Sequence, residues 1–179
     1  AYEKHANEIM TAVESCPVPT IAAIAGACTG GGAAIAACCD LRIATRDMKF
    51  GFPIARTLGN CLSSAILERL VRLIGEGRVK DLIFRARLMG AEEALTAGLV
   101  SEVVEDHAAL MTRAEELARE IAGHAPLTLR ATKELLRRAR EQSPKVDDTD
   151  IIARIYTSAD FREGLEAFLA KRQPQWSGR

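Results

Sequence analysis

The residues in this sequence best suited to chemistry are three consecutive glycines, Gly30, Gly31 and Gly32. They follow a short apolar stretch, residues 20–24, and precede a run of small, helix-compatible residues, 33–39. A strand, a glycine loop and a helix in that order expose backbone N–H groups at the positive end of the helix. Such a place attracts negative charge, either a bound phosphate or an oxyanion that develops during a reaction.

Two familiar phosphate-binding motifs do not fit this loop. A P-loop beginning at Gly26 requires a lysine after Gly31, where this chain has Gly32. A dinucleotide-binding loop beginning at Gly30 requires a small residue where Ile35 stands, and no acidic residue follows at the usual distance. The glycines alone could also serve only a tight turn and close packing of the helix on the strand.

The elements around this loop divide the chain into two predicted domains, a mixed α/β part over residues 1–105 and an all-helical part over residues 106–179. In the first part, the hydrophobic pattern predicts helices over 1–14, 33–39, 61–73, 76–86 and 91–97, and strands over 20–24, 40–45, 48–50 and 99–104. The segment 52–60 is predicted to be a loop. In the second part, helices are predicted over 107–122, 127–141, 148–157 and 159–171, with breaks at Pro126 and Pro144.

The composition excludes several classes of function. The chain has 179 residues and a formal net charge of zero, so a dominant role on nucleic acid or on an anionic membrane is not expected. No apolar run reaches the roughly 18 residues of a membrane span, and no secretory signal is visible. The five cysteines contain no CxxC pair and lie far in sequence from the histidines. We therefore expect neither a metal site nor disulfides, and a cytoplasmic location.

Collinear segments along essentially the whole chain resemble the enoyl-CoA hydratase/isomerase (crotonase) family. The segments are residues 19–32, with the strand and the GGG loop, and residues 39–44, 50–53, 88–94 with 97–100, and 160–164 with 167–172. The resemblance implies an α/β core of ββα spiral turns, incomplete at its N-terminus, and a helical C-terminal trimerisation domain. It also implies a bound acyl-CoA thioester as substrate or ligand, no separate cofactor, and a homotrimer or hexamer.

The resemblance assigns roles to several residues. In the family, two backbone N–H groups hold the thioester oxygen as it becomes an enolate, and Gly31, flanked by Gly30 and Gly32, matches the second donor. One such donor contributes about 3 kcal/mol to an oxyanion-forming step. The first donor and the preceding spiral turns lie, in the family, upstream of the position that matches Ala1. The N-terminal part of the fold is therefore expected to be missing from these residues.

Two further residues match positions whose family counterparts approach the CoA from a neighbouring subunit. They are Phe168 and Lys171, and the resemblance makes both of them substrate-binding candidates. Helix packing for Phe168 and a solvated charge for Lys171 are the simpler alternatives.

The two glutamates of the family's hydratases are absent. Their positions match Ala34 and Ile54, neither of which can transfer a proton, so hydration by two glutamates is expected to be excluded. Arg56 is a candidate for orienting an acyl carboxylate or stabilising an enolate, although a solvent-facing loop arginine is the alternative. Asp40, the acid nearest the glycine loop, is expected to cap the end of the helix or to pair with Arg42.

Three functions remain open from the sequence. One is an enzyme of the hydratase/isomerase type that acts on an acyl-CoA through a stabilised enolate. Another is a non-catalytic binder of fatty acyl-CoA, in which apolar residues have replaced the groups that transfer protons. A third interpretation is an assembly subunit whose helical tail docks on partners.

Overall fold

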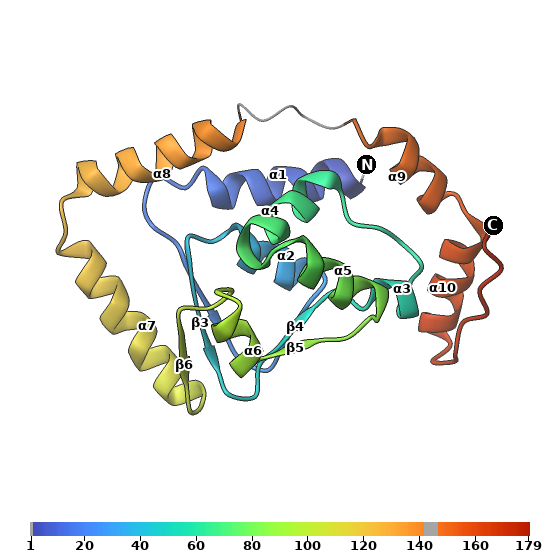
Figure 1. Cartoon of the computed structure of the whole chain (residues 1–179), viewed down its shortest axis with the longest axis horizontal. Coiled ribbons are helices and arrows are strands. Elements are labelled where there is room, and N and C mark those ends of the chain that lie inside the picture. Colours follow the sequence, from blue (N-terminus) through green and yellow to red (C-terminus); the bar gives the residue numbers. More distant parts are fainter. Residues whose placement is uncertain (1, 142–146) are drawn as a thin grey trace. The chain divides into compact units, whose positions relative to one another are not determined.

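The computed structural model describes residues 2–141 and 147–179, and its contacts group the chain into two compact units (Figure 1). One unit comprises Ala1–Phe50 with Met89–Lys145, and the other Gly51–Leu88 with Val146–Arg179. The predicted boundary near residue 106 follows secondary structure rather than these units, and it stays a prediction. The predicted break at Pro144 falls outside the described residues.

Within the described residues, six short strands form two three-stranded sheets. The first sheet has the order β1-β3-β6, with β1 (Ile21–Ile24), β3 (Leu41–Thr45) and β6 (Glu102–Val104) all parallel. The second has the order β2-β4-β5, formed by β2 (Ala27–Thr29), β4 (Lys49–Gly51) and β5 (Met89–Gly90). Each successive pair of strands places one strand in each sheet. This arrangement confirms the spiral fold that the resemblance implies.

The first unit also contains helices α1 (Tyr2–Glu14), α2 (Gly31–Cys38), α6 (Ala91–Thr96), α7 (His107–Ala122) and α8 (Pro126–Glu141). Helix α7 packs along β1 and β3 (Figure 1), where buried Ile43 meets Leu110 and Leu117. Burying one such side chain contributes about 1.5–3 kcal/mol. Because Leu110 and Leu117 are seven residues apart, they lie on one face of the helix, which explains why α7 follows this sheet.

The connection from β6 into α7 is fixed by polar groups. The Asp106 carboxylate accepts a hydrogen bond from the N–H of Ala109 (2.9 Å), which caps the helix. Arg113 on α7 donates to both carboxylate oxygens of Glu102 on β6, at 2.6 and 2.9 Å. This arginine lowers the pKa of Glu102, so the pair stays charged at neutral pH.

The second unit contains α3 (Ile54–Thr57), α4 (Ser64–Ile74), α5 (Glu76–Phe84), α9 (Thr149–Tyr156) and α10 (Ala159–Leu169). Gly75, at φ +81°, ends α4. Arg172 binds both oxygens of Glu163 on α10 at 2.6 and 2.9 Å, and together with the N–H of Gln175 it lowers the pKa of Glu163 to about 2. This carboxylate therefore holds the C-terminal tail against α10.

Three short elements were not predicted from the sequence. Strand β2 lies inside the predicted glycine loop, α3 lies inside the predicted loop 52–60, and β5 precedes α6. Along β3, Leu41 is only half-buried, whereas Arg42 is buried beside the fully enclosed Ile43 and Ala44.

Gly164 provides a test of packing within the second unit. A Cβ added at Gly164 would lie 2.4 Å from the carbonyl oxygen of Leu58, which is backbone and cannot move aside easily. We expect Gly164→Ala to lower the free energy of unfolding by about 2–3 kcal/mol. Gly77→Ala on α5 is the matched control, since a Cβ there meets nothing within 4 Å and alanine favours the helix by about 0.5–1 kcal/mol. Urea unfolding followed by circular dichroism compares the two variants, and equal stabilities would contradict the contact.

Candidate functional site

The start of α2 is shaped by two glycines with positive φ. The chain leaves β1, turns at Gly26 (φ +61°), forms β2 and turns again at Gly30 (φ +56°, ψ −125°) into the helix. The first turn is held by the N–H of Lys49, which donates to the Gly26 carbonyl at 2.8 Å. A side chain at either glycine would be strained, because L-residues other than glycine rarely adopt such backbone angles.

The first turn of α2 presents free backbone donors. The first helical hydrogen bond runs from the N–H of Ala34 to the Gly30 carbonyl at 3.0 Å. No acceptor among the described residues receives the N–H groups of Gly31 and Gly32, as expected for the first residues of a helix. Both glycines are exposed, and a Cβ at either would meet nothing within 4 Å. The first turn of α2 is therefore exposed at the positive end of the helix, and its first two N–H groups have no acceptor among the described residues.

The rest of α2 is packed through small side chains. Ala33 is fully buried, Ala34 is 6% exposed, and Ala36, Ala37 and Cys38 are buried as well. Such residues let the helix lie close to its neighbours, and α1 is one of them. Ala34 thus places a buried methyl group three residues after Gly31, where it cannot transfer a proton.

The remaining predicted site residues belong to the second unit. Ile54 is the first residue of α3 and is 7% exposed, so it is a buried apolar group. Arg56, two residues further along α3, is exposed, and its guanidinium forms no ion pair with any carboxylate that the structure describes. Phe168 on α10 is 62% exposed, which does not match plain helix packing within this chain.

Lys171 ends α10 in an unusual conformation. Its φ is +53°, and the N–H groups of Lys171 and Arg172 bond the carbonyls of Phe168 (3.2 Å) and Ala167 (3.0 Å). This hydrogen-bond pattern is a Schellman motif, in which glycine is the usual residue at the left-handed position. The lysine side chain is exposed. A non-glycine residue held at positive φ stores strain, which is a feature that accompanies functional positions.

The Asp40 carboxylate has different hydrogen-bond and ion-pair partners from those that the sequence predicts. Its carboxylate accepts from the N–H (2.8 Å) and hydroxyl (2.9 Å) of Thr20 and from the ammonium of Lys133 (2.6 Å). The predicted pairing with Arg42 and the predicted cap on α2 are therefore both wrong. Lys133 lies 93 residues further along the chain, so no local pattern could have indicated it. With three donors satisfied, Asp40 is a structural acid.

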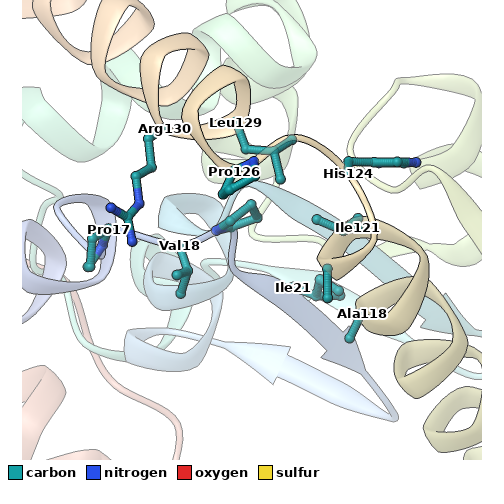
Figure 2. Close-up of a pocket in the computed structure, with 11 residues that line it drawn as sticks. Pro17, Val18, Ile21, Ala118, Ile121, His124, Pro126, Leu129 and Arg130 are labelled. Carbon is teal, nitrogen blue, oxygen red and sulfur yellow. The ribbon is translucent and has the colours of Figure 1, made fainter.

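A separate cavity of about 220 Å³ opens at the start of β1 (Figure 2). Its lining is mostly apolar and comes from residues 17–21 and from the connection between α7 and α8, including Val18, Ile121 and Leu129. Arg130 extends from α8 toward Pro17 at its edge (Figure 2). None of the predicted site residues lines this cavity. It lies at the end of β1 opposite to the glycine loop, and nothing in the sequence analysis pointed to it.

Among the described residues, 2–141 and 147–179, no helix is both long enough and apolar enough to cross a bilayer. Within the same ranges, no three His, Cys, Asp or Glu side chains lie together so that they could hold a metal ion.

The chain is similar in sequence to members of a known protein family. The sequence profile of the enoyl-CoA hydratase/isomerase family matches residues 1–179. The chain is 38% identical to a probable enoyl-CoA hydratase of Bacillus subtilis, covering 96% of this chain and 67% of the relative. It is 34% identical to a short-chain-enoyl-CoA hydratase of Clostridium acetobutylicum, covering 93% of this chain and 64% of the relative.

The structural similarity is also high. Methylmalonyl-CoA decarboxylase in complex with 2-nitronate-propionyl-CoA superposes with a TM-score of 0.92 at 30% identity, over 100% of this chain and 70% of the other. The chain belongs to the enoyl-CoA hydratase/isomerase, or crotonase, family. It spans between 52% and 67% of the length of the curated relatives that it matches.

The backbone angles of the glycine loop predict that alanine substitutions at Gly30 and Gly31 have different effects on stability. We expect Gly30→Ala to lower the free energy of unfolding by about 1–2 kcal/mol, because φ +56° is unfavourable for alanine. Gly31→Ala should leave the stability unchanged or raise it slightly, since a Cβ there meets nothing within 4 Å. Thermal unfolding of both variants checks this order, and the reverse order would rule out the conformation described for Gly30.

Proposed function

We propose that this chain binds an acyl-CoA thioester and stabilises the enolate form of its carbonyl at the first turn of α2. The observation that carries the proposal is the pair of exposed amides at Gly31 and Gly32, which have no acceptor among the described residues, in a chain of the crotonase family. A developing oxyanion gains about 3 kcal/mol from one well-placed N–H. The helix dipole adds to this effect at the same point.

The proposal does not include hydration. Adding water to an enoyl thioester requires a base to activate the water and an acid to protonate the α-carbon. Ala34 and Ile54 stand where the family resemblance places these two groups, and both side chains are apolar and buried. An apolar lining favours binding of an acyl chain over activation of water.

A second candidate reaction is decarboxylation of a malonyl-type acyl-CoA. The specific observation in its favour is the TM-score of 0.92 to methylmalonyl-CoA decarboxylase together with the apolar Ala34 and Ile54. In this reaction the bond between the α-carbon and the carboxylate breaks, and CO₂ leaves. The electron pair of that bond becomes the thioester enolate, which a proton from water then converts to the saturated acyl-CoA. No protein carboxylate is needed to remove a proton from carbon.

Arg56 is the residue that we propose for the acyl carboxylate in such a substrate. It carries an exposed guanidinium that no carboxylate of the described chain engages. Guanidinium binds carboxylate through two parallel hydrogen bonds, which makes arginine well suited to this task.

We also propose that the protein assembles as a homotrimer or hexamer through its C-terminal helices. Several large apolar side chains on these helices are exposed in the single chain, namely Leu127, Leu135, Leu136, Ile151, Leu165, Phe168 and Leu169. A contact between subunits would remove these side chains from water, which is the usual reason for such exposure on a soluble protein.

Three substrates separate the possible activities of the full-length protein. Isothermal titration with butyryl-CoA measures binding without reaction, loss of the conjugated thioester absorbance of crotonyl-CoA measures hydration, and release of CO₂ from methylmalonyl-CoA measures decarboxylation. We expect saturable binding, no hydration, and CO₂ release if the second candidate is right. Binding with neither reaction would identify a non-catalytic binder, and absence of binding would rule out the proposal.

Gly31→Pro tests the amide itself. Proline is well tolerated at the first position of a helix, and it removes only an N–H that has no acceptor among the described residues. We expect unchanged stability but about three- to tenfold weaker butyryl-CoA binding than in Gly31→Ala, which keeps the N–H. Any CO₂ release should fall by about a hundredfold. Equal binding by the two variants would show that this amide does not contact the thioester.

Lys171 offers a second test, in which stability and binding move in opposite directions. Lys171→Gly should raise the free energy of unfolding by about 1 kcal/mol, because glycine suits φ +53° at the end of α10. The same variant should bind butyryl-CoA more weakly, since it removes a cation at a position that the family resemblance places near the CoA. Lys171→Arg is the control and should keep both properties. Unweakened binding by the glycine variant would leave Lys171 as a solvated charge.

A further inference from the structure

Arg42 is a buried cation at the C-terminal end of α2. It is 8% exposed, although it lies on β3 between apolar residues. Its guanidinium donates hydrogen bonds only to backbone carbonyl oxygens, those of Cys39 (2.6 Å), Leu99 (2.7 Å), Ala36 (3.2 Å) and Asp40 (3.4 Å). Ala36 and Cys39 belong to the last turn and the cap of α2, and Leu99 follows the end of α6.

This arrangement is unusual because the cation has no carboxylate partner in the part of the chain that the structure describes. The nearest acid, Asp40, directs its carboxylate to Thr20 and Lys133 instead. A buried charge without a counterion is costly unless fixed dipoles replace its hydration. The carbonyls at the end of α2, which carry the negative end of the helix dipole, supply such dipoles.

The backbone of Arg42 is fixed as firmly as its side chain. Its carbonyl accepts from both the N–H (2.9 Å) and the hydroxyl (3.1 Å) of Ser101, and Arg42 pairs with Ala22 in the ladder between β3 and β1. The guanidinium therefore ties α2 to a sheet position and to the connection after α6. These contacts restrict movement of the C-terminal end of α2.

These contacts act on the other end of α2. The helix has eight residues and is about 12 Å long, so fixing its last turn fixes the direction and position of its first turn. A cation at the C-terminal end also cancels the negative pole of the helix dipole. The electrostatic potential at Gly31, at the positive pole, is then more positive, and it attracts an oxyanion more strongly.

We infer that Arg42 is a positioning residue for the amides of Gly31 and Gly32, acting through α2 by holding its C-terminal carbonyls and by supplying positive charge there. The part of this inference that concerns thioester binding rests on the proposed function. The part that concerns the placement of the amides does not. The two parts are tested by separate measurements.

The experiment compares the full-length protein with Arg42→Met, which removes the charge and all four hydrogen bonds, and Arg42→Lys, which keeps the charge alone. Ser101→Ala is the matched control, because it removes one hydrogen bond to the Arg42 carbonyl without touching the guanidinium. The first readout is the NMR spectrum of ¹⁵N-glycine-labelled protein without ligand, in which Gly31 and Gly32 report the first turn of α2. The second is the infrared stretching frequency of ¹³C-labelled butyryl-CoA carbonyl in the bound state.

In Arg42→Met we expect the amide signals of Gly31 and Gly32 to shift or broaden while those of Gly77 and Gly178 stay in place. Butyryl-CoA should bind about fivefold more weakly, and the lowering of its carbonyl frequency on binding should shrink. Arg42→Lys should lie between this variant and the unmodified protein, because one ammonium cannot reach all four carbonyls at once. Ser101→Ala should resemble the unmodified protein in both readouts.

Three outcomes would overturn the inference. One is an unchanged pair of glycine signals in Arg42→Met. Another is an Arg42→Lys protein whose glycine signals and carbonyl frequency match those of the unmodified protein. This outcome overturns the inference even if Arg42→Met does not fold. The third is loss of folding in both variants, which would assign Arg42 to stability alone. If the unmodified protein does not bind butyryl-CoA, the proposed function fails, while the glycine signals still decide whether Arg42 positions the helix.

Discussion

Unpaired backbone amides at the start of α2 are the feature on which the interpretation of this protein depends. An amide can stabilise a developing charge only if no protein acceptor already occupies it and if it is held in place beforehand. The first condition follows from helix geometry, which leaves the opening N–H groups of Gly31 and Gly32 without partners. The second requires structure outside the loop, because glycines supply no side chains with which to fix themselves.

Several interactions of the first unit meet that second condition. The turn at Gly26 is held by Lys49, the small residues of α2 permit close packing, and Arg42 binds the carbonyls at the far end of the helix. Asp40 lies at the same end but acts on the loop before β1 through Thr20 and on α8 through Lys133. The polar groups around α2 thus restrain its C-terminal end and leave its N-terminal end open.

The sequence predicted the parts of this arrangement that produce a periodic pattern. The apolar run before the glycines, the small residues after them and the amphipathic α7 each extend over enough residues to show their period. Strands β2 and β5 and helix α3 contain three, two and four residues, which is too short for a period to appear. The burial of Arg42 was missed for another reason. Alternation along β3 suggests a polar side chain facing water, whereas the partners of this arginine are carbonyls from other segments.

The family resemblance places two buried apolar residues, Ala34 and Ile54, at the positions of the family's two glutamates. On the function that we propose, neither side chain can act as an acid or base toward carbon, so the enolate would have to arise without proton removal by these residues. Loss of CO₂ meets this requirement, because the breaking C–C bond supplies the electron pair. An apolar environment also favours the loss of CO₂, because removal from water destabilises the charged carboxylate relative to the neutral CO₂. The replacement of the glutamates is therefore compatible with an active enzyme, provided that its substrate carries its own source of electrons.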